Sequence, residues 1–127
     1  MGRTADAIAE GVAIATAATR LAVKNHILVG TIALGGVFDI DKYVEDAREA
    51  LLSMADESQA AAELVTTLRK RARGRHSDPS STHDYRDRDV RNLRRRAKQS
   101  AGVAARLRAM AEDPDALREL VSGAREA

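Results

Sequence analysis

The sequence predicts an all-α fold: a long antiparallel helical hairpin, an apolar N-terminal helix and a short C-terminal helix. Three observations support this. Aromatic residues make up only 2% of the chain, so the core must be aliphatic, and Ala, Leu, Arg and Glu favour helices. Two long segments repeat small or apolar residues at alternating spacings of three and four. Turn-forming residues separate these segments. We expect one helical domain over 1–127, with helices at about 4–34, 39–73, 85–111 and 114–125.

The first predicted helix is apolar over most of its circumference. Thr4 is its candidate cap, and the pair Gly35 and Gly36 is its stop signal. The charged positions fall on one narrow stripe: Arg3, Asp6, Glu10, Arg20 and Lys24. A helix of this kind must be covered on more than one side, so we expect a second copy or another partner to cover it. A strand from Ile27 to Leu34 is the alternative, although no other segment is suited to pair with it.

The second predicted helix opens with a start signal. Asp39 can cap the first turn, and Phe38 can pack as a staple onto Tyr43. Small or apolar residues then follow at heptad spacing. They are Val44, Ala47, Leu51, Met54, Ser58, Ala61, Val65 and Leu68.

The third predicted helix continues this pattern after Asp84, its candidate cap. Its seam consists of Val90, Leu93, Ala97, Ser100, Ala104, Leu107 and Ala111. If the chain folds back about Pro79, the two seams face each other in register. Ser58 then faces Ser100, and Ala61 faces Ala97, which allows the two backbones to approach closely. The hairpin is therefore expected to pack like a coiled coil.

The last predicted helix is short and amphipathic. Asp113 is its candidate cap, and Pro114 occupies the first helical position, where proline is favoured. Leu117, Leu120 and Val121 form its apolar stripe. We therefore count four helices in the chain.

Charge is divided unevenly along the chain. Residues 69–98 hold twelve Lys or Arg and four Asp, a net +8, while the rest has a net −6, giving the overall +2. The planar guanidinium group of arginine matches the geometry of a phosphate, so the hairpin tip is a candidate nucleic-acid-binding site. The candidate phosphate contacts are Arg69, Arg71, Arg73, Arg75, Arg91, Arg94, Arg95 and Arg96.

The alternative for this basic segment is a solvated tip. Asp84 and Arg88, like Asp87 and Arg91, have the spacing of helical ion pairs. Tyr85 is the only aromatic residue nearby, which gives little support for base stacking. On this interpretation the protein is a structural oligomer or a protein adaptor that uses its apolar N-terminal helix.

Enzymatic signals are weak. The segment LGGVFD at 34–39 resembles the pyrophosphate loop of adenylating amidotransferases, but leucine replaces its serine and the acid is displaced. His83 and Asp84 resemble the metal pair of His-Asp phosphohydrolases, with His76 as a third candidate ligand, but they lie among arginines. We expect a non-enzymatic protein with no cofactor, no metal and no small-molecule substrate.

The chain contains no cysteine, which excludes disulfides and thiolate chemistry and fits a reducing cytoplasm. The longest stretch without Asp, Glu, Lys or Arg is fourteen residues from Asn25, against about twenty needed to span a bilayer. We therefore expect a cytoplasmic protein without a membrane-spanning helix.

Two segments, MGRTADAIAEGVAIATAA and THDYRDRDVRNLRRR, resemble short Ala/Arg-rich helical proteins of unknown function from high-GC actinobacteria. Some of these are labelled asparagine synthase. The resemblance implies no activity. The glutaminase half of an amidotransferase needs an N-terminal cysteine, which this chain lacks, and the pyrophosphate loop is not intact at LGGVFD. Our leading hypothesis is a helical scaffold that self-associates and whose basic tip contacts an anionic partner, with DNA or RNA as the first candidates.

Overall fold

The computed structural model describes residues 2–33, 35, 38–74 and 86–126, without the side chains of 72–74 and 86–89. Four helices account for nearly all of them: α1 (Arg3–Ala33), α2 (Ile40–Gly74), α3 (Arg86–Ala111) and α4 (Pro114–Glu126). The predicted all-α class is confirmed, and each helix begins and ends within one residue of its expected bounds. The strand alternative is wrong for residues 27–33, because α1 continues to Ala33.

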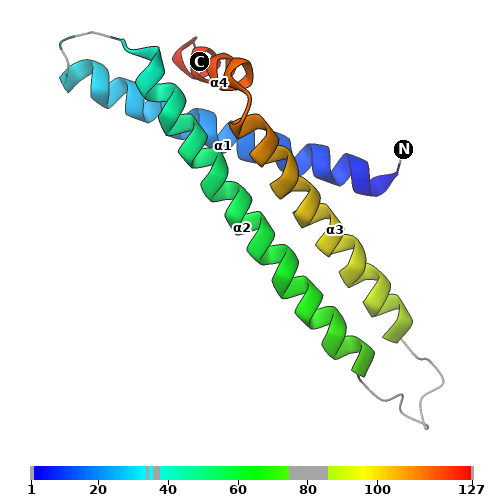
Figure 1. The fold of residues 1–127 in the computed structure, drawn as a ribbon. Coiled ribbons are helices and arrows are strands. Elements are labelled where there is room, and N and C mark those ends of the chain that lie inside the picture. The colour runs from blue at the N-terminus through cyan, green and yellow to red at the C-terminus, as the bar shows by residue number, and fades with distance from the viewer. Residues whose placement is uncertain (1, 34, 36–37, 75–85, 127) are drawn as a thin grey trace.

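Helices α2 and α3 lie side by side and run in opposite directions, and α1 and α4 pack against one end of this pair (Figure 1). The Ser58 hydroxyl donates a 2.7 Å hydrogen bond to the carbonyl of Ser100, the residue expected to face it. Closer to residue 111 of α3, the Arg108 guanidinium lies 3.3 Å from the Asp56 carboxylate of α2. We call the end near residues 40 and 111 the base, and the end near 74 and 86 the tip.

The hydrophobic core lies at the base, where all four helices meet (Figure 1). Leu51 of α2 and Leu107 of α3 are completely buried there, together with Val121 of α4. Helix α1 contributes Val23 and the buried Thr19, whose hydroxyl donates to the carbonyl of Ala15. Most of the tip half of the hairpin extends beyond α1 and α4 (Figure 1), so α2 and α3 mainly cover each other there, although the N-terminus of α1, at Thr4, reaches α3.

The predicted α2 seam is partly wrong in the tip half. Ala61 is exposed and Leu68 is 38% exposed, while Ala62 is buried; Val65 is buried as expected. The buried line runs from Leu51 to Ala62, an eleven-residue step over three turns. A straight α-helix drifts away from a strict seven-residue repeat by about 20° per heptad, so the contact line moves to the next residue.

Helix α1 crosses α3 at two glycines, which allow a close approach. A methyl group on Gly11 would lie 2.7 Å from the Val103 side chain, and one on Gly102 would overlap Ile8. Because each glycine receives a branched side chain from the other helix, this crossing fixes the position of α1 on the hairpin.

The start signals of α2 and α4 are confirmed. The Asp39 carboxylate accepts a 3.1 Å hydrogen bond from the Asp41 amide, and the Phe38 ring stacks 5.5 Å from that of Tyr43. The Asp113 carboxylate accepts from the amide of Asp115 at 3.1 Å.

The Thr4 cap is wrong: α1 begins one residue earlier, because the Asp6 amide donates to the carbonyl of Gly2. The Asp84 cap and the fold point at Pro79 lie outside the described residues.

Helix α1 is also long and apolar enough, by length and composition, to cross a membrane, with a mean hydropathy of 1.2 over its best window. The sequence expectation differs because it required a stretch without any charged residue, whereas this segment is apolar on average although charged side chains lie within it. A core helix of a soluble protein or a signal sequence meets the same criteria.

Candidate nucleic-acid interface

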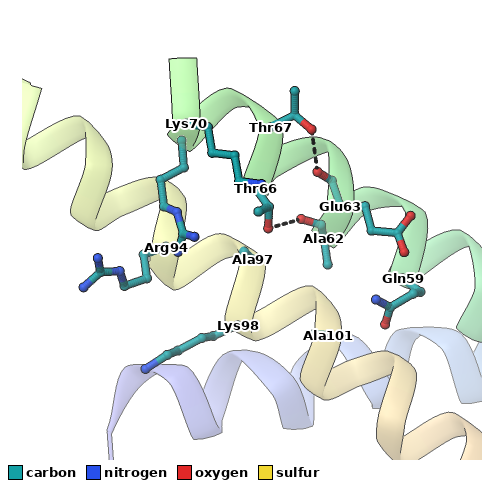
Figure 2. Close-up of a pocket in the computed structure, with 11 residues that line it drawn as sticks. Gln59, Ala62, Glu63, Thr66, Thr67, Lys70, Arg94, Ala97, Lys98 and Ala101 are labelled. Carbon is teal, nitrogen blue, oxygen red and sulfur yellow. Dashed lines mark hydrogen bonds between the residues drawn. The ribbon is translucent and has the colours of Figure 1, made fainter. Parts of the chain in front are cut away.

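An open groove of about 460 Å³ runs between α2 and α3 in the tip half of the hairpin. Cations from both helices line it: Arg69 and Lys70 from α2, and Arg94 and Lys98 from α3. Figure 2 shows Lys70, Arg94 and Lys98 around this opening, with Glu63 as the one labelled carboxylate. The groove therefore has an excess of positive charge contributed by two separate helices.

Helical spacing explains how the sequence builds this groove. Arg94 and Lys98 are four residues apart on α3, which places them on one face. Small side chains, Ala62 from α2 with Ala97 and Ala101 from α3, line the opening between the cations. Because alanine fills little space, the helices leave room between the long basic side chains. The groove is thus a product of the same small residues that allow close helix packing.

Some polar groups in the groove have hydrogen-bond partners and one does not. The hydroxyl of Thr66 donates to the carbonyl of Ala62 at 2.9 Å, and that of Thr67 donates to the carbonyl of Glu63. In contrast, the Nε atom of Arg69 is buried and has no hydrogen-bond partner. A buried donor without an acceptor is costly, so an anion that reached this guanidinium would satisfy it.

A second, smaller opening of about 170 Å³ lies where the N-terminus of α1 meets α3. Thr4 lines it together with Arg91, Arg94, Arg95 and Lys98. Arg94 and Lys98 belong to both openings. The two openings therefore form one cationic surface, which we call the basic tip surface; it consists of Arg69, Lys70, Arg91, Arg94, Arg95 and Lys98.

The basic tip surface includes four of the eight arginines singled out from the sequence: Arg69, Arg91, Arg94 and Arg95. Arg71 and Arg96 are exposed and line neither opening. The Arg73 side chain and all of Arg75 lie outside the described part of the chain.

Sequence reasoning missed Lys70 and Lys98, because it favoured arginine over lysine for phosphate recognition. The spacing of Lys98 from Arg94 was the available signal for that residue. Lys70 carried no comparable signal, since its place in the groove depends on the drift of the α2 contact line.

Charge at the base is arranged differently. Among the described residues, the ion pairs that join different helices or the α3–α4 link all lie in the base half. Arg48 lies 3.5 Å from Glu112, and Arg118 lies 3.5 Å from Asp41. Arg48 and Arg118 at the base therefore have carboxylate neighbours, whereas Glu63 is the single carboxylate lining the described tip openings.

The candidate metal ligands and the LGGVFD segment lie only partly within the described residues. Within the described ranges, no group of three His, Asp or Glu side chains is placed to hold a metal ion, and His76, His83 and Asp84 lie outside those ranges. In LGGVFD, Gly35 follows α1 with a φ of 68°, and its amide donates to the carbonyl of Ile32. This left-handed glycine is typical of a helix end.

Comparison with known protein families, curated proteins and solved structures finds no match for this chain.

Proposed function

We propose that the protein is a non-enzymatic helical scaffold whose basic tip surface binds the phosphate backbone of a nucleic acid. The observation that carries this proposal is the convergence of α2 and α3 cations on one open groove, with Arg94 and Lys98 shared by a second opening. Phosphate contacts of this kind release counterions and supply sequence-independent affinity.

The chemistry of the surface favours backbone contact over base recognition. No aromatic side chain lines either described opening, and stacking of bases requires such side chains. Its cations are long and its lining alanines are small, which suits a convex phosphate ridge entering the groove. We therefore expect binding that depends weakly on sequence, with duplex DNA and duplex RNA as separate arms of the test.

The experiment is a titration of fluorescent 20-base-pair DNA and RNA duplexes at low salt with wild-type protein and the double variant Arg94→Gln/Lys98→Gln. Removal of two phosphate contacts should weaken binding at least tenfold, since hydrogen bonds to charged groups contribute about 1.5–3 kcal/mol each. The control is Arg106→Gln, which removes one exposed cation about 12 Å beyond Lys98 along α3.

The expected result is strong loss of affinity in the double variant and a change of less than about threefold in the control, in keeping with long-range charge effects only. Both variants should retain wild-type helicity and melting temperature, because the substituted side chains are exposed. If neither duplex binds wild-type protein at low salt, the proposal is wrong, and the alternative of a structural oligomer without nucleic-acid binding takes its place.

A further inference from the structure

The outer face of α1 carries an apolar seam that no described part of the chain covers. Its members follow spacings of four and three without interruption, and all are exposed. They are Ile14, Ala18, Leu21, Asn25, Leu28 and Ile32. Leu21 is 61% exposed and Ile32 is 82% exposed. The opposite face of α1 buries Thr19, Val23 and Ile27 against the other helices, so the seam is directed away from the hairpin.

The residue types along the seam identify the kind of partner. In heptad terms, Ile14, Leu21 and Leu28 occupy d positions, and Ala18, Asn25 and Ile32 occupy a positions. Leu28 followed by Ile32 has the pattern of leucine at d and a β-branched residue at a that favours two parallel strands, and a single asparagine at a specifies register and oligomeric state. We infer that α1 forms a parallel two-stranded coiled coil with α1 of a second copy of this chain.

Asn25 decides between the two orientations. In a parallel pair, Asn25 faces Asn25 of the second copy, so each amide can donate to the other. In an antiparallel pair centred on the seam, Asn25 would face a leucine and would lose its hydrogen bonds to water. A lipid surface would leave the amide unpaired in the same way, so a second copy is the occupant that gives Asn25 a hydrogen-bond partner.

The size of the seam fits a specific but reversible contact. Together with the flanking Val29, which is 69% exposed, pairing would remove on the order of 1,000 Å² from water across both copies, near the lower limit for specific interfaces. Toward the N-terminus the seam positions continue at Gly11 and Ala7, which carry no large apolar side chain, so the seam ends at Ile14. We therefore expect association that depends on protein concentration.

Parallel pairing also has a consequence for the basic tip surface. Thr4, near the start of α1, lines the second basic opening, so the two copies would hold their openings at the same end of the pair. This consequence rests on the proposed function, whereas the association itself does not.

The test uses sedimentation velocity over a hundredfold range of protein concentration, with no nucleic acid present. Wild-type protein should pass from one chain per particle to two, and Leu21→Glu should raise the dissociation constant at least tenfold. Leu64→Glu is the matched control, because Leu64 is an equally exposed leucine (62%) on α2; it should leave the dissociation constant unchanged. Circular dichroism should show wild-type helicity in both variants.

Orientation is tested with Ala18→Cys, which introduces the only thiol in a chain without cysteine and keeps Asn25; Ala18 faces Ala18 of the second copy in the parallel pair but Leu28 in the antiparallel one. Under mild oxidation this variant should form a covalent dimer in the parallel arrangement, and Leu64→Cys should crosslink at least tenfold more slowly. Three results would overturn the inference: a wild-type monomer at every concentration, equal crosslinking of the two cysteine variants, or a monomer that floats with phosphatidylcholine/phosphatidylglycerol vesicles through α1. Because no step contains nucleic acid, failure here leaves the proposed function to its own test.

Discussion

The base and the tip of the hairpin are built from the same two helices but contribute different properties. At the base, α1 and α4 cover α2 and α3, and Leu51 and Leu107 are fully buried. At the tip, α2 and α3 pack mainly against each other, with the N-terminus of α1 beside α3, and an open groove lies between α2 and α3. One end of the hairpin therefore supplies the stability, which leaves the other end able to carry an uncompensated charge.

Charge follows the same division. The base cations Arg48 and Arg118 lie beside Glu112 and Asp41, whereas the described tip openings are lined by six cations and a single carboxylate. Like charges that gather on one surface destabilise a compact fold. The hydrophobic core holds the helices together at the base, at a distance from those charges. This separation limits the destabilisation that the like charges cause.

The largest expected effect is at the base. Leu107→Ala should lower the free energy of unfolding by about 2–5 kcal/mol, because it leaves a cavity in the packed core. Leu68→Ala, near the tip, should cost only about 1–2 kcal/mol, since that side chain is 38% exposed. Urea denaturation of both variants measures the comparison, and equal costs would show that the base does not dominate stability.

A smaller effect tests the contact line of α2. Ala62→Leu should overpack the α2–α3 contact and cost about 1–3 kcal/mol, because Ala62 is only 5% exposed. Ala61→Leu should stay within about 0.5 kcal/mol, as is usual for exposed positions. Thermal unfolding of the two variants distinguishes them. The reverse order would restore the strict heptad register and contradict the structure.

The smallest effect concerns the cap of α4, the helix that closes the base. Asp113→Ala removes the acceptor for the Asp115 amide and should cost about 0.5–2 kcal/mol. Glu119→Ala on the exposed face of the same helix should change stability by less than about 0.5 kcal/mol. Chemical denaturation provides the measurement, and a neutral Asp113→Ala would mean that α4 contributes little to the base.

Local signals in the sequence predicted the helices, because capping and periodicity act within a few residues. Asp39, Asp113 and the Phe38–Tyr43 staple all lie as expected. The burial of Ala62 in place of Ala61 was not predictable in this way, because it depends on drift accumulated along a long helix. The pairing of Gly11 with Val103 likewise requires the crossing of α1 and α3, which no local pattern specifies.

The candidate site was only partly predictable for the same reason. Charge counting identified the cationic end of the chain, but not which cations meet at one groove. That depends on which faces of α2 and α3 converge, and it brings in Lys70 and Lys98 while leaving Arg71 and Arg96 outside the described openings. The exposed seam of α1 became distinct from its buried face only once the packed side of that helix was known.

The most direct test of the central claim is the salt dependence of duplex binding by wild-type protein and by Arg94→Gln/Lys98→Gln. If five cations of the basic tip surface contact phosphates, log affinity should fall against log salt with a slope of about −4.5. The double variant should flatten this slope by about 1.8, since two contacts are lost. Equal slopes for wild-type and variant protein would show that the basic tip surface is not where the nucleic acid binds.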